Sequence, residues 1–116
     1  MTEHIRIYWH PMRGRNTLNF NWDAIDSDSI VHVSASEYRA KGQPLFIGES
    51  EPRFVGGANV HVDNVSPHGP DEGDPNHGVT FVVNVDWDDP LPIVTDITVF
   101  DEKPVEVQYG EGAVVS

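Results

Sequence analysis

Apolar and polar residues alternate along much of this chain with a period of two, which is the pattern of β-strands that bury one face. The clearest case is segment 79–88, whose apolar face comprises Val79, Phe81, Val83, Val85 and Trp87. Segment 93–100 is β-branched at most positions and follows the turn residues Asp88, Asp89 and Pro90. We therefore expect two antiparallel strands that pair as a hairpin.

Weaker forms of the same alternation predict further strands. They are segments 4–9, 18–23, 30–33, 45–47, 54–65 and 105–109. About eight strands at this spacing are typical of a β-sandwich or barrel, and 116 residues are enough for one hydrophobic core but not for two. The sequence predicts a single all-β domain over residues 1–116, an antiparallel β-sandwich of about seven to eight strands that is immunoglobulin-like or jelly-roll-like.

Several segments depart from the strand pattern. Ser34 and Glu37 have the spacing of a capping box, which predicts at most one short helix near residues 35–41. Gly56 and Gly57 are expected to interrupt the strand pattern of segment 54–65. Segment 66–78 holds three prolines and three glycines and is predicted to be an exposed loop. Residues 110–116 are predicted to be a loose tail.

Acidic residues dominate the charge of the chain. Nineteen acids against seven lysines and arginines produce a net charge of −12, which argues against nucleic acid as a partner. Segment 54–102 contains no lysine or arginine, whereas residues 1–15, predicted as a basic N-terminal arm, hold Arg6, Arg13 and Arg15. This asymmetry favours head-to-tail contact between copies and predicts an oligomer. The shortage of lysine suggests a halophilic or high-GC host.

The composition also excludes several kinds of chemistry and location. The chain has no cysteine, so disulfides and thiolate chemistry are excluded. We find no signal-peptide pattern and no apolar run of membrane-spanning length, so we expect no membrane partner and a cytoplasmic or virion location. No nucleophile elbow or phosphate-binding glycine motif occurs, so we expect no enzymatic activity.

Two sets of side chains are candidate metal ligands. The first set combines histidines and a carboxylate for a transition metal, with His61 and Asp63 on one strand face and His68 and His77 in the following loop. The second set offers carboxylates for calcium. It comprises Asp71, Glu72 and Asp74 in one loop and Asp86, Asp88 and Asp89 in another. Both sets are equally compatible with an acidic, solvated surface, so we expect no cofactor, with calcium as the alternative.

Aromatic residues divide into two groups. Trp9, Trp22 and Trp87 fall on the apolar faces of their strands and are expected in the core. Tyr8 and Tyr38 fall outside that pattern and are candidate contact residues. Together with Arg6, Arg13 and Arg15 they form the predicted interface.

These observations favour a non-enzymatic structural or assembly module that binds itself or a larger protein scaffold, such as a virion head-decoration or tail component. A calcium-dependent carbohydrate-binding module is the alternative. An acidic DNA mimic and an unrecognised hydrolase are further hypotheses, the first supported by the charge alone.

Overall fold

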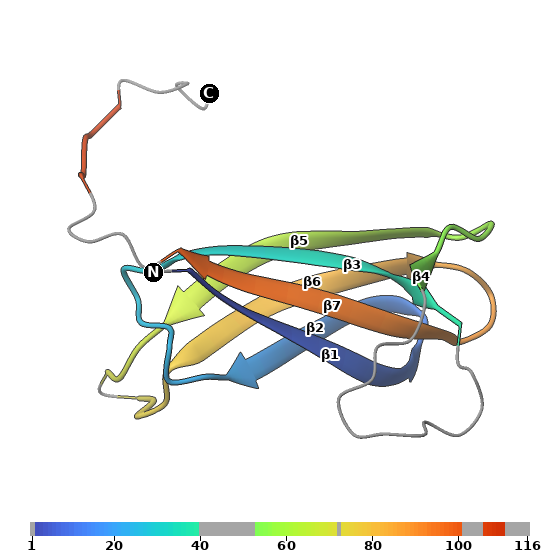
Figure 1. The fold of residues 1–116 in the computed structure, drawn as a ribbon, viewed down its shortest axis with the longest axis horizontal. Helices are drawn as coiled ribbons and strands as arrows, with labels where there is room; N and C mark the ends of the chain where they lie inside the picture. Colours follow the sequence, from blue (N-terminus) through green and yellow to red (C-terminus); the bar gives the residue numbers. More distant parts are fainter. Residues whose placement is uncertain (1, 40–52, 72, 101–105, 111–116) are drawn as a thin grey trace.

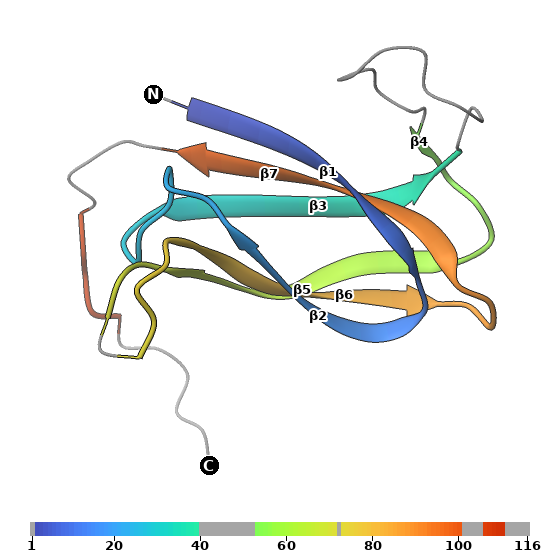
Figure 2. The same cartoon turned by 90° about the horizontal axis from the view of Figure 1, so that it is seen from below.

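The computed structural model describes residues 2–39, 53–71, 73–100 and 106–110. Within these ranges the fold consists of seven β-strands in two antiparallel sheets, with no helix. The two sheets lie face to face as two layers (Figures 1 and 2). The predicted all-β sandwich is therefore confirmed.

Each sheet combines strands that are distant in the sequence. Sheet A has the order β1-β7-β3-β4, from β1 (Thr2–Met12), β7 (Leu91–Phe100), β3 (Ile30–Tyr38) and β4 (Arg53–Phe54). Sheet B has the order β2-β6-β5, from β2 (Gly14–Asn21), β6 (Gly78–Asp86) and β5 (Asn59–His68). In the described part of the chain, β1 is therefore an outermost strand of sheet A.

Consecutive strands lie in different sheets at four places, from β1 to β2, from β2 to β3, from β4 to β5 and from β6 to β7. The chain passes from β1 to β2 through Arg13 and Gly14, and the positive φ of Gly14 (68°) suits this sharp change of direction. It passes from β6 to β7 through residues 87–90. Because β1 pairs with β7 and β2 pairs with β6, the four strands form a bent ribbon that spans both layers, a jelly-roll-like arrangement.

This topology makes the predicted hairpin wrong. Strand β6 pairs with β2 and β5, whereas β7 pairs with β1 and β3. Each strand still buries the face that its alternation predicts, because the two inner faces pack against each other across the sandwich. Alternation indicates which side of a strand is buried, but not which strand supplies its hydrogen bonds.

The hydrophobic core lies between the two sheets. Its buried members are Ile25, Val33, Val79, Phe81, Val83, Val85, Ile93, Ile97 and Val99. Trp9 and Trp22 pack against this core, as predicted. Trp9 meets Phe81 edge-to-face, with 6.3 Å between ring centroids. Trp87 lies beyond the end of β6 and is 47% exposed, so its predicted burial is wrong.

The predicted helix near residues 35–41 is wrong for the residues that the structure describes. Ser34 to Tyr38 belong to β3, which pairs with β7 from Ile30 to Glu37. The inner positions Val33 and Ala35 contribute to the core while Ser34 and Ser36 lie on the outer face. Long-range pairing therefore outweighs the local capping pattern. Residues 40 and 41 lie outside the described ranges.

Other predicted boundaries also change. The basic segment 1–15 is not an arm, since residues 2–12 form β1 and Gly14 begins β2. The predicted loop 66–78 is shorter, because β5 extends to His68 and β6 begins at Gly78. The chain is interrupted at Gly56 and Gly57 as predicted. Residues 106–109 belong to no strand, and segment 45–47 lies outside the described residues, as does the tail beyond Gly110.

Candidate functional site

The residues predicted to bind a transition metal are divided between two places on sheet B. On the outer face of β5, His61 Nε2 lies 3.5 Å from Asp63 Oδ2, and Asn84 donates a hydrogen bond of 2.7 Å to the same oxygen. Strand β5 pairs with β6 at this point, and Val62 lies opposite Val83. His68 and His77 lie at or near the far end of β5, so the four residues do not converge.

His68 and His77 instead hold together the loops at one end of the sandwich. His68 Nε2 lies 2.7 Å from Asn19 Oδ1, and its Nδ1 lies 3.0 Å from the carbonyl oxygen of Asn76. His77 Nδ1 lies 2.7 Å from the carbonyl oxygen of Ile25. His77 also lines an open cleft of about 660 Å³ at this end. The other lining residues include Glu3, Trp22 and Asp23.

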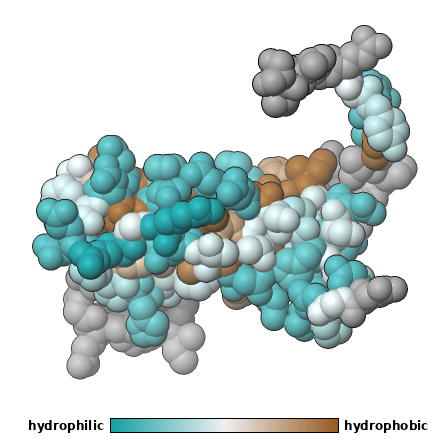
Figure 3. Space-filling view, turned by 180° about the vertical axis from the view of Figure 1, so that it is seen from behind, coloured by the Kyte–Doolittle hydropathy of each residue, from teal (hydrophilic) through white to brown (hydrophobic). Residues whose placement is uncertain are grey.

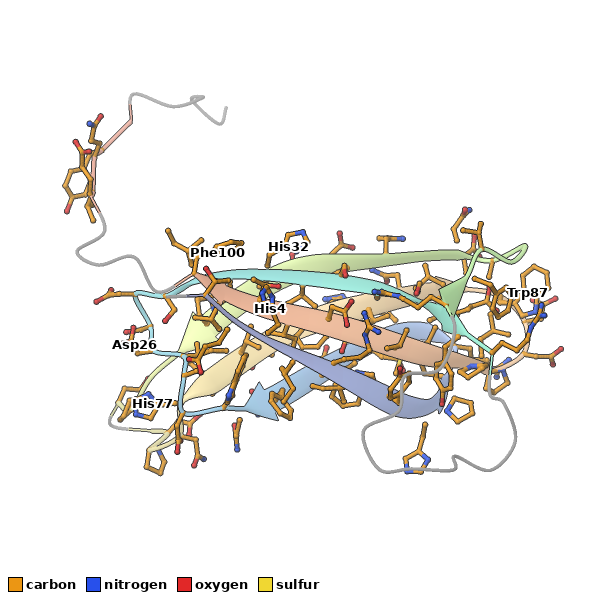
Figure 4. All side chains as sticks on the ribbon, in the orientation of Figure 1. His4, Asp26, His32, His77, Trp87 and Phe100 are labelled. Atoms are coloured by element: carbon orange, nitrogen blue, oxygen red, sulfur yellow. The ribbon has the colours of Figure 1, made fainter. Side chains whose placement is uncertain are left out.

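The two predicted calcium sets lie at opposite ends of β6. Asp71 and Asp74 belong to the loop before β6, and Asp71 Oδ1 accepts hydrogen bonds from the backbone amides of Gly73 and Asp74. Asp86, Asp88 and Asp89 lie at or just beyond the other end of the strand, roughly 26 Å away at the rise of a β-strand. Figure 4 shows His77 and Trp87, which flank β6 in the sequence, at opposite ends of the sandwich. Glu72 lies outside the described residues.

In the described ranges no group of three or more His, Cys, Asp and Glu side chains is arranged to hold a metal ion. The calcium and transition-metal sites stay predictions.

A different cluster occupies the outer face of sheet A. Asp96, in the central part of β7, lies opposite Arg6 of β1 on one side and Ser34 of β3 on the other. Arg6 donates two hydrogen bonds to its carboxylate, from Nε at 2.7 Å and from Nη2 at 3.1 Å. Arg53 of β4 forms a second ion pair with Asp96 and donates a bond of 2.7 Å to Ser36 Oγ. Four strands thus contribute to one polar cluster.

Electrostatics in this cluster favours the charged forms. The hydrogen bond from Arg6 holds the pKa of Asp96 below its ordinary value of 3.8, and the charge of Arg53 lowers that pKa further, although partial burial opposes both effects. The same hydrogen bond raises the pKa of Arg6. Both arginines remain accessible, since the Arg6 and Arg53 side chains are 39% and 29% exposed.

Two of the predicted contact residues meet beside this cluster. The rings of Tyr8 and Tyr38 pack edge-to-face, with 4.9 Å between centroids and an interplanar angle of 72°. Tyr8 lies opposite Val94, which points to the outer face and is nevertheless fully buried.

The opposite end of the same face is apolar. Ile30 and Phe100 are cross-strand neighbours and remain 49% and 39% exposed. Between them and the ion pairs, His4 and His32 flank Thr98, and His4 Nδ1 lies 3.1 Å from Thr98 Oγ1. Figure 4 shows Phe100, His4 and His32 near this end of the sheet. We call this outer surface of β1, β7 and β3, with Arg53, the sheet A face.

The sheet A face unites only part of the predicted interface. It contains Arg6, Tyr8 and Tyr38, whereas Arg13 and Arg15 lie at the corner between the two sheets. Arg13 donates a hydrogen bond of 2.7 Å to the carbonyl oxygen of Asp88. Sequence reasoning missed the roles of Asp96 and Arg53, because only the register of β1, β7, β3 and β4 brings them together.

The outer face of sheet B has a different character. Its side chains form a hydrogen-bonded polar network in which Asn19 Oδ1 accepts from Thr80 Oγ1 at 2.9 Å and Asn19 Nδ2 donates to Asn21 Oδ1 at 2.8 Å. Figure 3 views the molecule from this side and shows a mainly hydrophilic surface. The exposed aromatic and aliphatic groups of the sheet A face contrast with it.

The fold and this surface define a class, a two-layer all-β sandwich whose sheet A face carries arginine, aspartate, tyrosine and exposed aliphatic groups. Comparison with known protein families, curated proteins and solved structures finds no match for this chain. In the part of the chain that the structure describes, no helix has the length and hydropathy of a membrane span.

Proposed function

We propose that this protein is a non-enzymatic assembly module, a subunit that binds copies of itself or a larger protein scaffold through the sheet A face. The observation that carries the proposal is the composition of this face. Tyrosine and arginine are enriched at protein interfaces, because they offer a large contact area and several hydrogen bonds. Exposed apolar neighbours such as Ile30 and Phe100 add area whose burial favours association.

The charge of the face supports the same proposal. Two arginines, Arg6 and Arg53, share the single carboxylate of Asp96, whereas the chain as a whole has a net charge of −12. An acidic surface, including that of another copy, is therefore attracted to this face. Association through it should weaken as the salt concentration rises.

The test is the mass of the purified protein in solution, measured by sedimentation over a range of protein and salt concentrations. We expect a concentration-dependent assembly. The double variant Ile30→Thr and Phe100→Ser should weaken association about tenfold, which corresponds to about 1.4 kcal/mol. The matched control is Thr17→Ala, an exposed position on the outer face of sheet B. A protein that stays monomeric at every concentration and salt would refute self-assembly.

The finer expectation, a virion head-decoration or tail component, stays a prediction. It requires that the chain be recovered in a particle of much larger mass. Native mass measurement of the complex that contains the chain in its host decides between such a particle and a small oligomer.

A further inference from the structure

An amphipathic segment near the C-terminus, residues 106–110, lies outside the strands that the structure describes. Residues 106–110 are all exposed and belong to no strand. Val107 and Tyr109 are 71% and 97% exposed, and they alternate with Glu106 and Gln108. Gln108 Nε2 donates a hydrogen bond of 3.1 Å to Glu106 Oε1, so the two polar side chains lie on one side. Figures 1 and 2 show this segment away from both sheets.

Strand β1 offers a matching edge. With eleven residues it is the longest strand, and it is outermost in sheet A among the described strands. The backbone groups along the outer side of such a strand are a template for a further strand. Its inward-facing residues Ile5 and Ile7 are only partly buried. Its first half also borders two open cavities.

These cavities lie on opposite faces of β1. One, of about 390 Å³, is lined by His4, Arg6 and Asp96 with Ile5 and Thr98. The other is the cleft of about 660 Å³ that Glu3 and Trp22 line. An added strand would therefore find space for its side chains on both faces of the sheet.

We propose that residues 106–109 of one copy add as an antiparallel strand to the outer edge of β1, the outermost described strand of sheet A, in a second copy. This inference rests on the proposed assembly function and names one of its contacts. Glu106 lies opposite Arg6, whose side chain is 39% exposed, and Gln108 lies opposite His4. These two pairs lie on the outer face of the sheet.

The apolar side chains of the segment face inward in this register. Val107 lies beside Ile5 and covers its exposed part. Tyr109 lies beside Glu3 and enters the cleft lined by Trp22. The alternation of the segment thus matches the two faces of the edge strand, with charged and amide groups outside and apolar groups inside.

Chain connectivity favours a second copy over the same chain. Strand β7 ends at Phe100, beside Thr2 of β1, and five residues separate Phe100 from Glu106. A segment antiparallel to β1 runs parallel to β7, and parallel strands need a connection of about a dozen residues or more. The contact is therefore between copies and joins different surfaces of each, which builds head-to-tail assemblies.

Disulfide trapping tests the contact directly, because the chain has no cysteine. Protein carrying His4→Cys is mixed with protein carrying Gln108→Cys under mild oxidation. Residues that face each other across antiparallel strands lie within the distance that a disulfide requires. We expect a covalent dimer of the two variants in at least tenfold excess over the control mixture, in which Thr17→Cys on sheet B replaces His4→Cys.

A second measurement uses the wild-type cysteine-free background. The double variant Val107→Thr and Tyr109→Ser should weaken self-association at least tenfold, whereas Val55→Thr, at a position 98% exposed and outside the proposed contact, should not. Because residues 55, 107 and 109 are exposed, neither variant should change the unfolding midpoint at protein concentrations where the wild type is monomeric.

The outcomes separate this contact from the proposed function. Strand addition is refuted, while assembly stands, if the wild type assembles and two further results hold. The cross-link does not exceed that of the control mixture, and the double variant Val107→Thr and Tyr109→Ser associates as tightly as the wild type. A monomeric wild type refutes both strand addition between copies and self-assembly. If one chain carrying both cysteines forms an intramolecular disulfide in dilute solution and the mixed variants do not cross-link, the segment binds its own chain, and the inference is overturned.

Discussion

Replacing Asp96 with asparagine is expected to lower the free energy of unfolding at pH 7 by about 1–2 kcal/mol. Asparagine keeps the shape and one acceptor oxygen but loses the charge that Arg6 and Arg53 share. All three side chains are between 28% and 39% exposed, so each ion pair contributes about 0.2–1 kcal/mol, as exposed pairs do. The substitution also leaves two guanidinium groups near each other without a shared counter-ion. For this reason the expected loss lies near the upper limit of about 2 kcal/mol that two such ion pairs allow.

The pH dependence follows from the lowered pKa of Asp96. Because the pKa is lower in the folded than in the unfolded protein, the stabilisation is complete above the ordinary value of 3.8 and is lost as the pH falls through the folded pKa. Asparagine does not titrate. The stability difference between wild type and Asp96→Asn should therefore be constant from pH 7 to about pH 5 and shrink below pH 3.8.

Urea denaturation at a series of pH values measures this difference, with a constant slope as the check that both proteins unfold in the same way. The matched control is Asp63→Asn on sheet B, where the carboxylate contacts His61 and Asn84. Equal stability of wild type and Asp96→Asn at pH 7 would refute the reasoning. So would a difference that persists unchanged in acid.

Three further predictions concern a hydrogen bond in the core, the close approach of Gly78 to the backbone of β2, and calcium binding. Thr95→Val should lower the free energy of unfolding by about 1–3 kcal/mol, because Thr95 Oγ1 accepts the 2.8 Å hydrogen bond from Trp9 Nε1 and valine leaves the indole N–H without it. In a Trp9→Phe background the same change should cost far less, and an equal cost in urea denaturation would contradict this account. Gly78→Ala should lower the thermal midpoint by several degrees, because its β-carbon would collide with the backbone carbonyl of Phe20, whereas Gly110→Ala, with open space around it, should leave the midpoint unchanged. Millimolar calcium should raise the thermal midpoint if the predicted acidic sites bind the ion in the native state, and an unchanged midpoint would contradict that prediction.

The candidate site shows where sequence reasoning stops. Tyr8 and Tyr38 are recognisable because they fall outside the apolar positions of their strands, and Arg6 because it belongs to a basic segment. Asp96 looks like any other acid in an acidic chain. Its role depends on the place of β7 between β1 and β3, which brings Arg6 within 2.7 Å across a separation of 90 residues.

The sequence by itself determined the class of the fold, the buried face of the main strands and the uneven distribution of charge. These are local properties, since period-two alternation and composition do not depend on distant residues. The tertiary structure decided which strands are neighbours, turning an expected hairpin into a crossing between sheets and an expected helix into part of β3. Strand pairing joins residues far apart in the chain, so register and sheet order, which build the sheet A face, follow only from how the whole core closes.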